Sequence, residues 1–149
     1  MKRSALAALI LAGVVVWSVR TDHDVSAQPR KSFKVTRLFT GTDGQTHAED
    51  VDVKLNPSGN AGELSQMIKV SGLQFRRQTP HYFQDWHTAP RRQYVITLSG
   101  HGEVELAGGK KVPLDPGHIL LAEDVTGKGH ISRGVGTEDR LSLFIPVAE

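Results

Sequence analysis

The stretch 85–100, "DWHTAPRRQYVITLSG", indicates how the chain folds. A histidine, His87, precedes a proline, and a run of alternating side chains then ends at Ser-Gly. Alternating runs bounded by proline and glycine predict β-strands. Successive side chains of a strand point to opposite faces, so we expect His87 and Ala89 to share a face. Pro90 disturbs a regular strand, and Gln93 then begins the next set of residues that share a face.

Strand signals of the same kind recur along the rest of the chain at intervals of about eight to twelve residues, with glycine between them. There is no convincing amphipathic helix, no internal repeat and no low-complexity tract. This pattern predicts a single all-β domain, a sandwich or a barrel. The expected strands are 33–39, 49–55, 67–77, 93–100, 102–109, 110–114, 118–124, 130–136 and 140–147.

Residues 1–27 are typical of a secretory signal peptide. A short basic start is followed by an apolar stretch, and Val25 and Ala27 occupy the −3 and −1 positions of a cleavage site after Ala27. Cleavage leaves residues 28–149 as one domain without a membrane segment, in the periplasm or secreted. An uncleaved N-terminal anchor is the alternative interpretation.

The charge and cysteine content exclude some classes of protein. Lys and Arg number 18 against 16 Asp and Glu, which gives a formal net charge of +2. Nucleic-acid binding needs a concentrated basic face, so we expect no nucleic-acid partner. The chain has no cysteine, which excludes disulfides and thiol chemistry. An exported domain of this length must therefore be stabilised by its core alone.

The segment 85–147 resembles the small single-domain bacterial cupins. Their first motif has the form G-x5-H-x-H-x3,4-E-x6-G, and "HTAPRRQYVITLSG" follows its spacing. His87 matches the first histidine and Gly100 the closing glycine. Ala89 stands where the second histidine belongs, and Gln93 where the glutamate belongs. The resemblance implies an all-β cupin jelly-roll, the double-stranded β-helix barrel.

The second cupin motif, G-x5-P-x-G-x2-H-x3-N, is matched less closely by "DPGHILLAEDVTGKGH". Gly117 matches a glycine of this motif and His130 its histidine, and the spacing between them is two residues longer than in the motif. The motif's proline is absent, and Gly134 stands near the position of its asparagine. The resemblance covers about half of residues 28–149 well. Because this fold hosts enzymes, binders and storage proteins alike, it does not by itself identify an activity.

The cupin resemblance implies a metal site, for which His87, Gln93 and His130 are the candidate ligands. Imidazole donors suit a divalent transition metal, namely Fe, Mn, Ni, Cu or Zn. Two neutral imidazoles and an amide leave the charge of the ion uncompensated, which lowers affinity. Asp85 has the strand parity of His87 and is the candidate carboxylate, and Glu123 and Asp124 are alternative acids that could face outward.

Other residues near His87 are candidates for contact with an organic ligand. Tyr82, Phe83 and Trp86 could form an aromatic wall, although packing across strands explains them equally well. An inward-facing Arg91 would bind a carboxylate or phosphate through its guanidinium fork. The candidate ligand-binding residues are Asp85, Trp86, Arg91 and Tyr94.

Two classes of function follow from these residues. One is a binding module that holds a small polar or aromatic ligand in the barrel, with or without a divalent metal. The other is a metal-dependent oxygenase or an isomerase-type enzyme acting on a similar molecule. Whether a reaction is catalysed stays open. The cupin resemblance also suggests a homodimer, to which the apolar run 140–147 could contribute.

Overall fold

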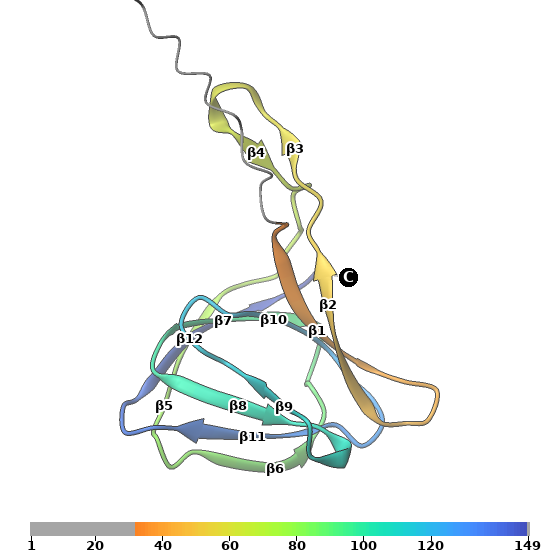
Figure 1. Cartoon of the computed structure of the whole chain (residues 1–149), viewed down its shortest axis with the longest axis vertical. Coiled ribbons are helices and arrows are strands. Elements are labelled where there is room, and N and C mark those ends of the chain that lie inside the picture. Colours follow the sequence, from red (N-terminus) through yellow and green to blue (C-terminus); the bar gives the residue numbers. More distant parts are fainter. Residues whose placement is uncertain (1–31, 149) are drawn as a thin grey trace, which may run out of the picture. The chain divides into compact units, whose positions relative to one another are not determined.

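The computed structural model describes residues 32–148, and the predicted signal peptide lies outside them. Within that range no helix is long and apolar enough to cross a membrane. The elements, labelled in Figure 1, are β1 (Lys34–Thr40), β2 (Thr46–Asp52), β3 (Asn56–Pro57), the 3₁₀ helix η1 (Gly59–Ala61), β4 (Glu63–Leu64), β5 (Gln74–Gln78), β6 (Phe83–His87), β7 (Gln93–Ser99), β8 (His101–Glu105), η2 (Ala107–Gly109), β9 (Lys111–Pro113), β10 (Ile119–Glu123), β11 (His130–Val135) and β12 (Arg140–Pro146).

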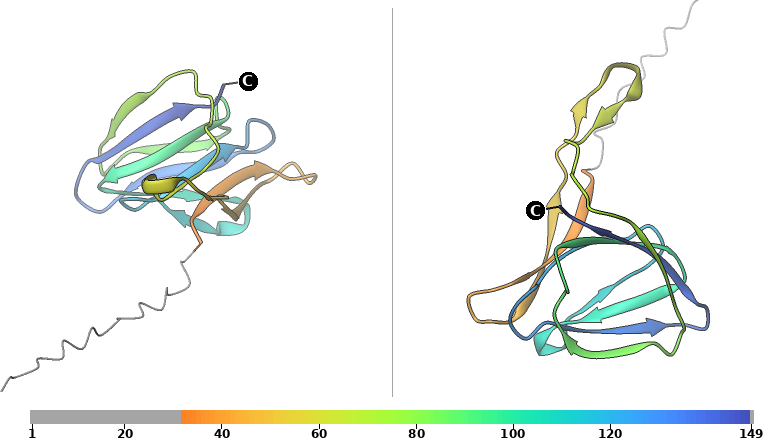
Figure 2. Two further views of the ribbon diagram at one scale, coloured as in Figure 1. Left: turned by 90° about the horizontal axis from the view of Figure 1, so that it is seen from above. Right: turned by 180° about the vertical axis from the view of Figure 1, so that it is seen from behind.

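The last eight strands form a jelly roll. They make two four-stranded layers in the orders β5-β12-β7-β10 and β6-β11-β8-β9. The chain crosses between the layers at nearly every step, which is the double Greek key of the jelly roll. Strand β1 extends the first layer by pairing in parallel with β10, and β2 pairs with β1. Figure 2 shows the two layers curving around a common interior. The all-β jelly-roll expected from the sequence is therefore confirmed.

The core lies where the two layers meet. Its most buried members are Leu38 on β1 and Val104 on β8, which are 0% and 1% exposed. Inward-facing aliphatic residues of both layers contribute the rest, as the period-two pattern of a half-buried strand requires. The complete cluster is Leu38, Val95, Val104, Leu106, Val112, Leu114 and Leu120, with Ala48 and Phe144 packed against it.

Pro90 lies between two strands that belong to different layers, and it thus divides the stretch 85–100, from which the fold was predicted. Strand β6 ends at His87 and belongs to the β6-β11-β8-β9 layer, whereas β7 begins at Gln93 in the other layer. Strand β6 was not among the strands expected from the sequence. Its burial pattern shows why, because four of its five residues are exposed and it has no apolar alternation.

Three expected strands have different boundaries. The strand predicted at 102–109 ends at Glu105, and Ala107–Gly109 form the 3₁₀ helix η2. The strand predicted at 49–55 runs from Thr46 to Asp52, because its length is set by pairing with β1. The long strand predicted at 67–77 is strand only at Gln74–Gln78. Before it, Val70 forms an isolated bridge to Val147, and the backbone is otherwise irregular. Residues without a neighbouring strand cannot complete a ladder, whatever their sequence pattern.

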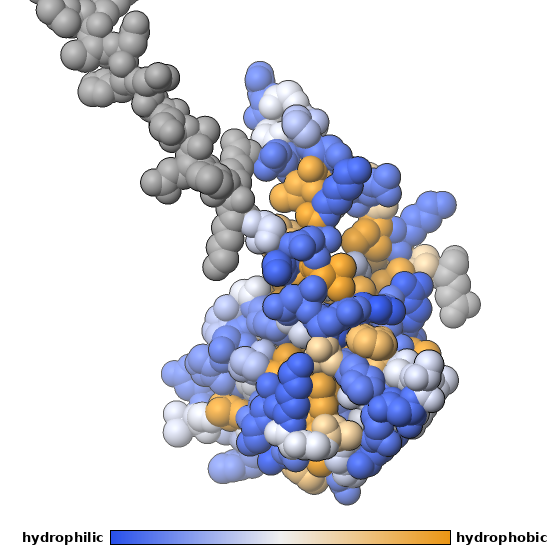
Figure 3. Space-filling model, turned by 45° about the vertical axis from the view of Figure 1, so that its right-hand side comes forward, coloured by the Kyte–Doolittle hydropathy of each residue, from blue (hydrophilic) through white to orange (hydrophobic). Residues whose placement is uncertain are grey.

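Several apolar side chains are exposed around the β3–β4 hairpin, which extends away from the barrel (Figure 1). Leu64, Met67 and Ile68 are 53%, 95% and 47% exposed. Figure 3 shows hydrophobic residues at the surface between polar ones. On β12, Leu141, Leu143 and Ile145 are only half-buried. Both surfaces could contribute to a subunit contact, and the homodimer stays a prediction.

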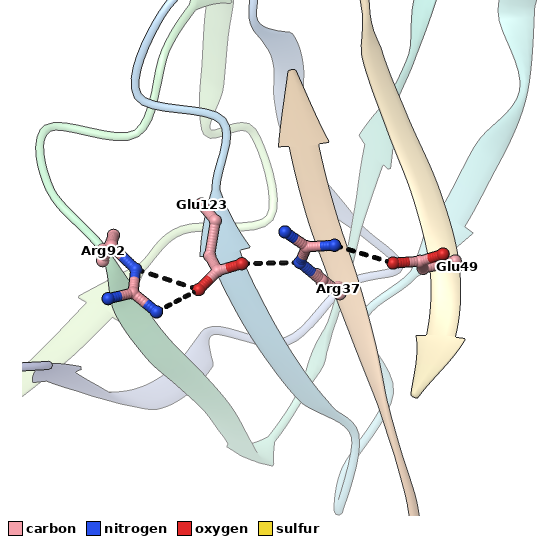
Figure 4. A network of polar contacts seen from close by, with 4 residues as sticks. All are labelled: Arg37, Glu49, Arg92 and Glu123. Atoms are coloured by element: carbon pink, nitrogen blue, oxygen red, sulfur yellow. Dashed lines mark hydrogen bonds and ion pairs between the residues drawn. The ribbon is translucent and has the colours of Figure 1, made fainter. Parts of the chain in front are cut away.

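An ion-pair network links the strands that extend the first layer (Figure 4). Glu123 at the end of β10 accepts hydrogen bonds from Nε of Arg37 at 2.5 Å and Nε of Arg92 at 2.9 Å, and Arg37 also binds Glu49 at 2.9 Å. Burial alone would raise the pKa of Glu123, but these hydrogen bonds outweigh it and lower that pKa. Glu123 is therefore engaged in this network and is not a ligand in the barrel.

Candidate functional site

A cavity of about 830 Å³ lies between the two layers. Its volume is within the range of small-molecule sites in proteins, roughly 300–1,000 Å³. The core residues Val95, Val104 and Leu120 form its apolar side. Its charged lining residues are one acid, Glu103, and four arginines, at positions 76, 91, 133 and 140. The cavity thus combines an apolar wall with an excess of positive charge.

Two histidines meet at this cavity. His87 is the last residue of β6 and His130 the first of β11, and they are partners across the antiparallel pair. Side chains at paired positions leave a sheet on the same face, which brings the rings together. Their centroids lie 4.4 Å apart, with the planes inclined by 60°. The convergence of two distant histidines thus follows from strand register.

Hydrogen bonds orient both imidazoles. Nδ1 of His87 donates to the carbonyl oxygen of Asp85 at 2.7 Å. Nδ1 of His130 lies 2.6 Å from Oδ2 of Asp124 and donates to it. In the neutral form of each ring, Nε2 then keeps its lone pair and can accept a hydrogen bond from a ligand. Within residues 32–148, neither Nε2 atom has a protein partner.

Asp124 supports this arrangement from behind His130. Its side chain is 0% exposed, and its Oδ2 also accepts a hydrogen bond from Oγ1 of Thr46 at 3.0 Å. Its backbone carbonyl accepts a bond from the amide of Ala89 at 3.1 Å. Asp124 was an alternative acid that could face outward, but it points inward. It holds a histidine in place instead of lining the cavity itself.

Gly129 lets the loop before β11 approach β6 closely. Its φ is +75°, and a Cβ at this position would lie 2.0 Å from the carbonyl oxygen of His87. Only glycine combines this left-handed conformation with so close a backbone contact. The sequence "TGKGH" therefore serves the packing of His130 against His87.

The environment of His87 lowers the pKa of its imidazole. Burial is the main cause, and the nearby His130 adds to it, while the hydrogen bond to the carbonyl of Asp85 opposes the shift. The unperturbed pKa of a histidine is about 6.5. Near neutral pH the ring of His87 is therefore neutral, which suits a hydrogen-bond acceptor in the cavity.

We expect this shift to make the folded protein less stable in mild acid. Above the unfolded pKa of 6.5, the ring is neutral in both states and contributes nothing. Below it the unfolded chain binds a proton more readily than the native one, so the free energy of unfolding falls until the pH passes the folded pKa. Urea unfolding at about pH 7 and about pH 5 should show a larger loss for the wild type than for His87→Gln. Equal losses would contradict the shift.

The candidate site residues from the sequence divide into two groups. His87, Arg91, Gln93 and His130 all line the cavity, and Gln93 is 7% exposed. The other three candidates, Asp85, Trp86 and Tyr94, lie outside the cavity. Trp86 and Tyr94 each adjoin a lining residue, His87 and Gln93 respectively, and strand alternation turns them to the opposite face.

Asp85 is not the carboxylate that the sequence suggested for this site. Its side chain is exposed, and its Oδ1 accepts a hydrogen bond from the amide of Trp86 at 2.9 Å. Trp86 itself is covered by Nζ of Lys128, 4.0 Å from the ring centroid, in a cation–π contact at the surface. The proposed aromatic wall at Trp86 thus faces solvent and not the cavity.

Sequence reasoning missed three of the four arginines of the cavity, Arg76, Arg133 and Arg140. Arg140, the first residue of β12, is only 5% exposed, and Arg76 on β5 is half-buried. Arg140 begins the alternating run 140–147, and that pattern does not indicate which face of the strand lines a cavity. In the structure Arg140 and Ser142 are buried, whereas Leu141 and Leu143 on the other face are half-buried. No local signal distinguishes the two faces.

The residues present do not fit a tightly held divalent metal. Within residues 32–148, no group of three or more His, Cys, Asp and Glu side chains is arranged to hold one. Around the two histidines, Ala89 has no donor and Gln93 offers a neutral amide. The surrounding arginines add further positive charge, which opposes a cation. The metal-ligand role of His87, Gln93 and His130 thus stays a prediction that the donor set does not favour.

No protein-family model matches the chain, and no curated protein matches it either. Among solved structures, it is similar to a protein of Salmonella typhimurium LT2 designated ethanolamine utilization protein Q, with 13% identity, a TM-score of 0.41 and coverage of 80% of this chain and 100% of the other. An RmlC-like cupin protein from Desulfovibrio desulfuricans has 16% identity, a TM-score of 0.38 and coverage of 83% and 93%. A conserved Streptococcus pyogenes protein of unknown function has 16% identity, a TM-score of 0.36 and coverage of 64% and 96%. The strand order given above defines the jelly roll, and these neighbours transfer no ligand or activity to this chain.

Proposed function

We propose that this small jelly-roll protein binds a small organic ligand in its barrel cavity, with His87, Gln93 and His130 as the polar groups that recognise it. The observation that carries the proposal is the composition of the cavity. An apolar wall from the core stands beside a few convergent polar side chains, which is the usual make-up of a small-molecule site. Export to the periplasm, expected from residues 1–27, would make this a ligand-binding protein of the cell envelope.

The hydrogen-bond inventory supports this role. Two Nε2 atoms with free lone pairs accept from a ligand hydroxyl or amine, and the amide of Gln93 both donates and accepts. Asp85 and Asp124 already orient the two rings, so little side-chain entropy is lost when a ligand binds. The metal-dependent oxygenase or isomerase-type enzyme is less well supported, because no group of three or more His, Cys, Asp and Glu side chains within residues 32–148 is arranged to hold a metal.

Ligand binding is tested with four ring compounds of similar size, namely benzoate, phenyl phosphate, benzamide and benzamidine. Titration of the ¹⁵N-labelled full chain should shift backbone resonances of cavity-lining residues for at least one of them. The variants His87→Ala and Gln93→Leu should weaken that binding, whereas His81→Ala, an exposed histidine outside the cavity, should not. If no compound perturbs the cavity, the ligand-binding function is wrong.

Metal content separates the proposal from its alternative. The full chain, purified without a histidine tag and incubated in turn with Fe, Mn, Ni, Cu and Zn, should retain far less than one metal per chain after gel filtration. Mass spectrometry of the His87→Ala and His130→Ala variants gives the baseline. Near-stoichiometric metal in the parent, lost in both variants, would support a metal centre and overturn the metal-free site.

A further inference from the structure

We infer that the ligand carries an anionic group, a carboxylate or a phosphate, which binds between Arg140 and Arg76 at the end of the cavity formed by β5 and β12. The inference rests on the proposed ligand-binding function and names the chemical class of its ligand. It comes from two cationic side chains that share a face of the barrel and have no anionic partner there.

The position of Arg140 is built into the fold. The backbone of Gly102 on β8 lies directly under its side chain, because a Cβ there would be 3.1 Å from Cδ of Arg140. Nη1 donates to Oε1 of Gln78 at 2.9 Å, and Nε and Nη2 donate to Oγ1 of Thr97 at 3.1 and 2.9 Å. The guanidinium is therefore held by neutral acceptors from two neighbouring strands, in one orientation.

These bonds leave part of the guanidinium unused. They employ three of its N–H groups, so within residues 32–148 one N–H on each terminal nitrogen has no protein acceptor. Two N–H groups on adjacent nitrogens match the two oxygens of a carboxylate or of a phosphate. Because Arg140 is nearly buried and lines the cavity, an acceptor for them must come from a molecule inside it.

Arg76 brings a second uncompensated charge to the same place. Strand β12 pairs with β5 so that Arg140 faces Gln78 and Ser142 faces Arg76, which makes the two arginines diagonal neighbours on one face. Nη2 of Arg76 donates to the Tyr82 hydroxyl at 3.1 Å. Among residues 32–148, neither Arg76 nor Arg140 has a carboxylate in an ion pair.

The other charged groups of the cavity do not neutralise this pair. Glu103 is engaged by Lys111 at 2.8 Å and by Arg133 at 3.3 Å, and Arg133 also binds Glu105. Burial lowers the pKa of Arg140 to about 10, and the charge of Arg76 adds to the effect, yet Arg140 remains cationic at neutral pH. Two like charges in a partly buried site are unfavourable, and a bound anion removes that cost.

The aromatic rings around the arginines indicate the rest of the ligand. The guanidinium of Arg76 lies 5.3 Å from the ring centroid of Tyr82 and 5.1 Å from that of Phe144. A small organic acid would thus have its charge at Arg140, an apolar body against these rings and Val95, and a polar end toward the histidines.

The four ring compounds used above test the class of ligand. Benzoate or phenyl phosphate should bind at least about tenfold more tightly than the neutral benzamide and the cationic benzamidine, since only the anions form charge-assisted hydrogen bonds with the two arginines. Whichever anion binds more tightly identifies the carboxylate or the phosphate as the natural group. Equal binding of all four compounds would leave the ligand-binding function standing and overturn the anionic class, whereas no binding would overturn both.

Variants locate the subsite. Arg140→Met and Arg76→Met should each weaken anion binding about tenfold or more, while benzamide binding changes little. Arg77→Met is the matched control, because Arg77 is adjacent on β5, 73% exposed in its side chain and outside the cavity. Arg76 lacks the buried contacts of Arg140, so its variant remains informative if Arg140→Met does not fold. Unchanged anion affinity in Arg76→Met, or a loss equal to that in Arg77→Met, would overturn the subsite.

Discussion

Replacing Asp124 with alanine is expected to lower the free energy of unfolding by about 3–5 kcal/mol. The carboxylate is completely buried and serves both the imidazole of His130 and the hydroxyl of Thr46. Its removal leaves two buried polar groups without partners and a small cavity. Because Thr46 begins β2 and His130 begins β11, the loss also weakens the connection between the two layers.

Asp85→Ala provides the matched control for Asp124→Ala. Asp85 is exposed and makes one side-chain hydrogen bond, to the next amide along the chain, so its loss should cost less than about 1 kcal/mol. Urea unfolding of both variants gives the comparison. The ¹⁵N shifts of His130 provide a second measurement, because without Asp124 its proton is no longer held on Nδ1. Equal destabilisation by the two substitutions would contradict the role assigned to Asp124.

Gly129→Ala is expected to be as damaging as the loss of Asp124, for a steric reason. The methyl group would lie 2.0 Å from the carbonyl oxygen of His87 and 2.7 Å from the amide nitrogen of Thr88. Both contacts are with backbone, so no side-chain rotation relieves them. The left-handed conformation costs roughly 1–2 kcal/mol, and the overlap roughly 1–3 kcal/mol or more. The free energy of unfolding should therefore fall by about 3–5 kcal/mol.

Gly136→Ala isolates the conformational part of that cost. Gly136 has a similar φ of +84°, but no atom lies within 4 Å of a Cβ at its position. Its replacement should cost only roughly 1–2 kcal/mol. Thermal and urea unfolding of both variants, with the ring-current shifts of His87 as a local probe, measure the difference. A Gly129→Ala protein as stable as Gly136→Ala would show that β6 and the loop before β11 separate easily.

The strands of the barrel could be predicted where one face is apolar. Strands β7 and β10 have alternating side chains with a buried face, and their ranges agree with the sequence to within about two residues. Strand β6 could not be found in this way. Four of its five residues are exposed, and it lies at the edge of its layer, where it pairs with β11 alone.

The candidate site shows the same division. His87, Gln93 and His130 could be named from the sequence, because their spacing matches a motif with a recognised pattern. Their partner Asp124 could not be assigned, since an acid that follows a strand gives no indication of whether it faces water or a histidine. The inward position of Arg140 could not be predicted either, because both faces of β12 are at least half-buried and the alternation does not distinguish them.

By itself, the sequence determined the all-β class, and its resemblance to the cupins implied the jelly roll and placed the two histidines at motif positions. These properties depend on local alternation, on turn glycines and on motif spacing, all of which are present in a short stretch of chain. Only the tertiary structure decided which charges meet inside the barrel. Strand order and register bring Arg76 to Arg140, and Asp124 to His130, from distant segments. The net charge of the cavity depends on side chains from several distant segments, so it cannot be predicted from any one of them.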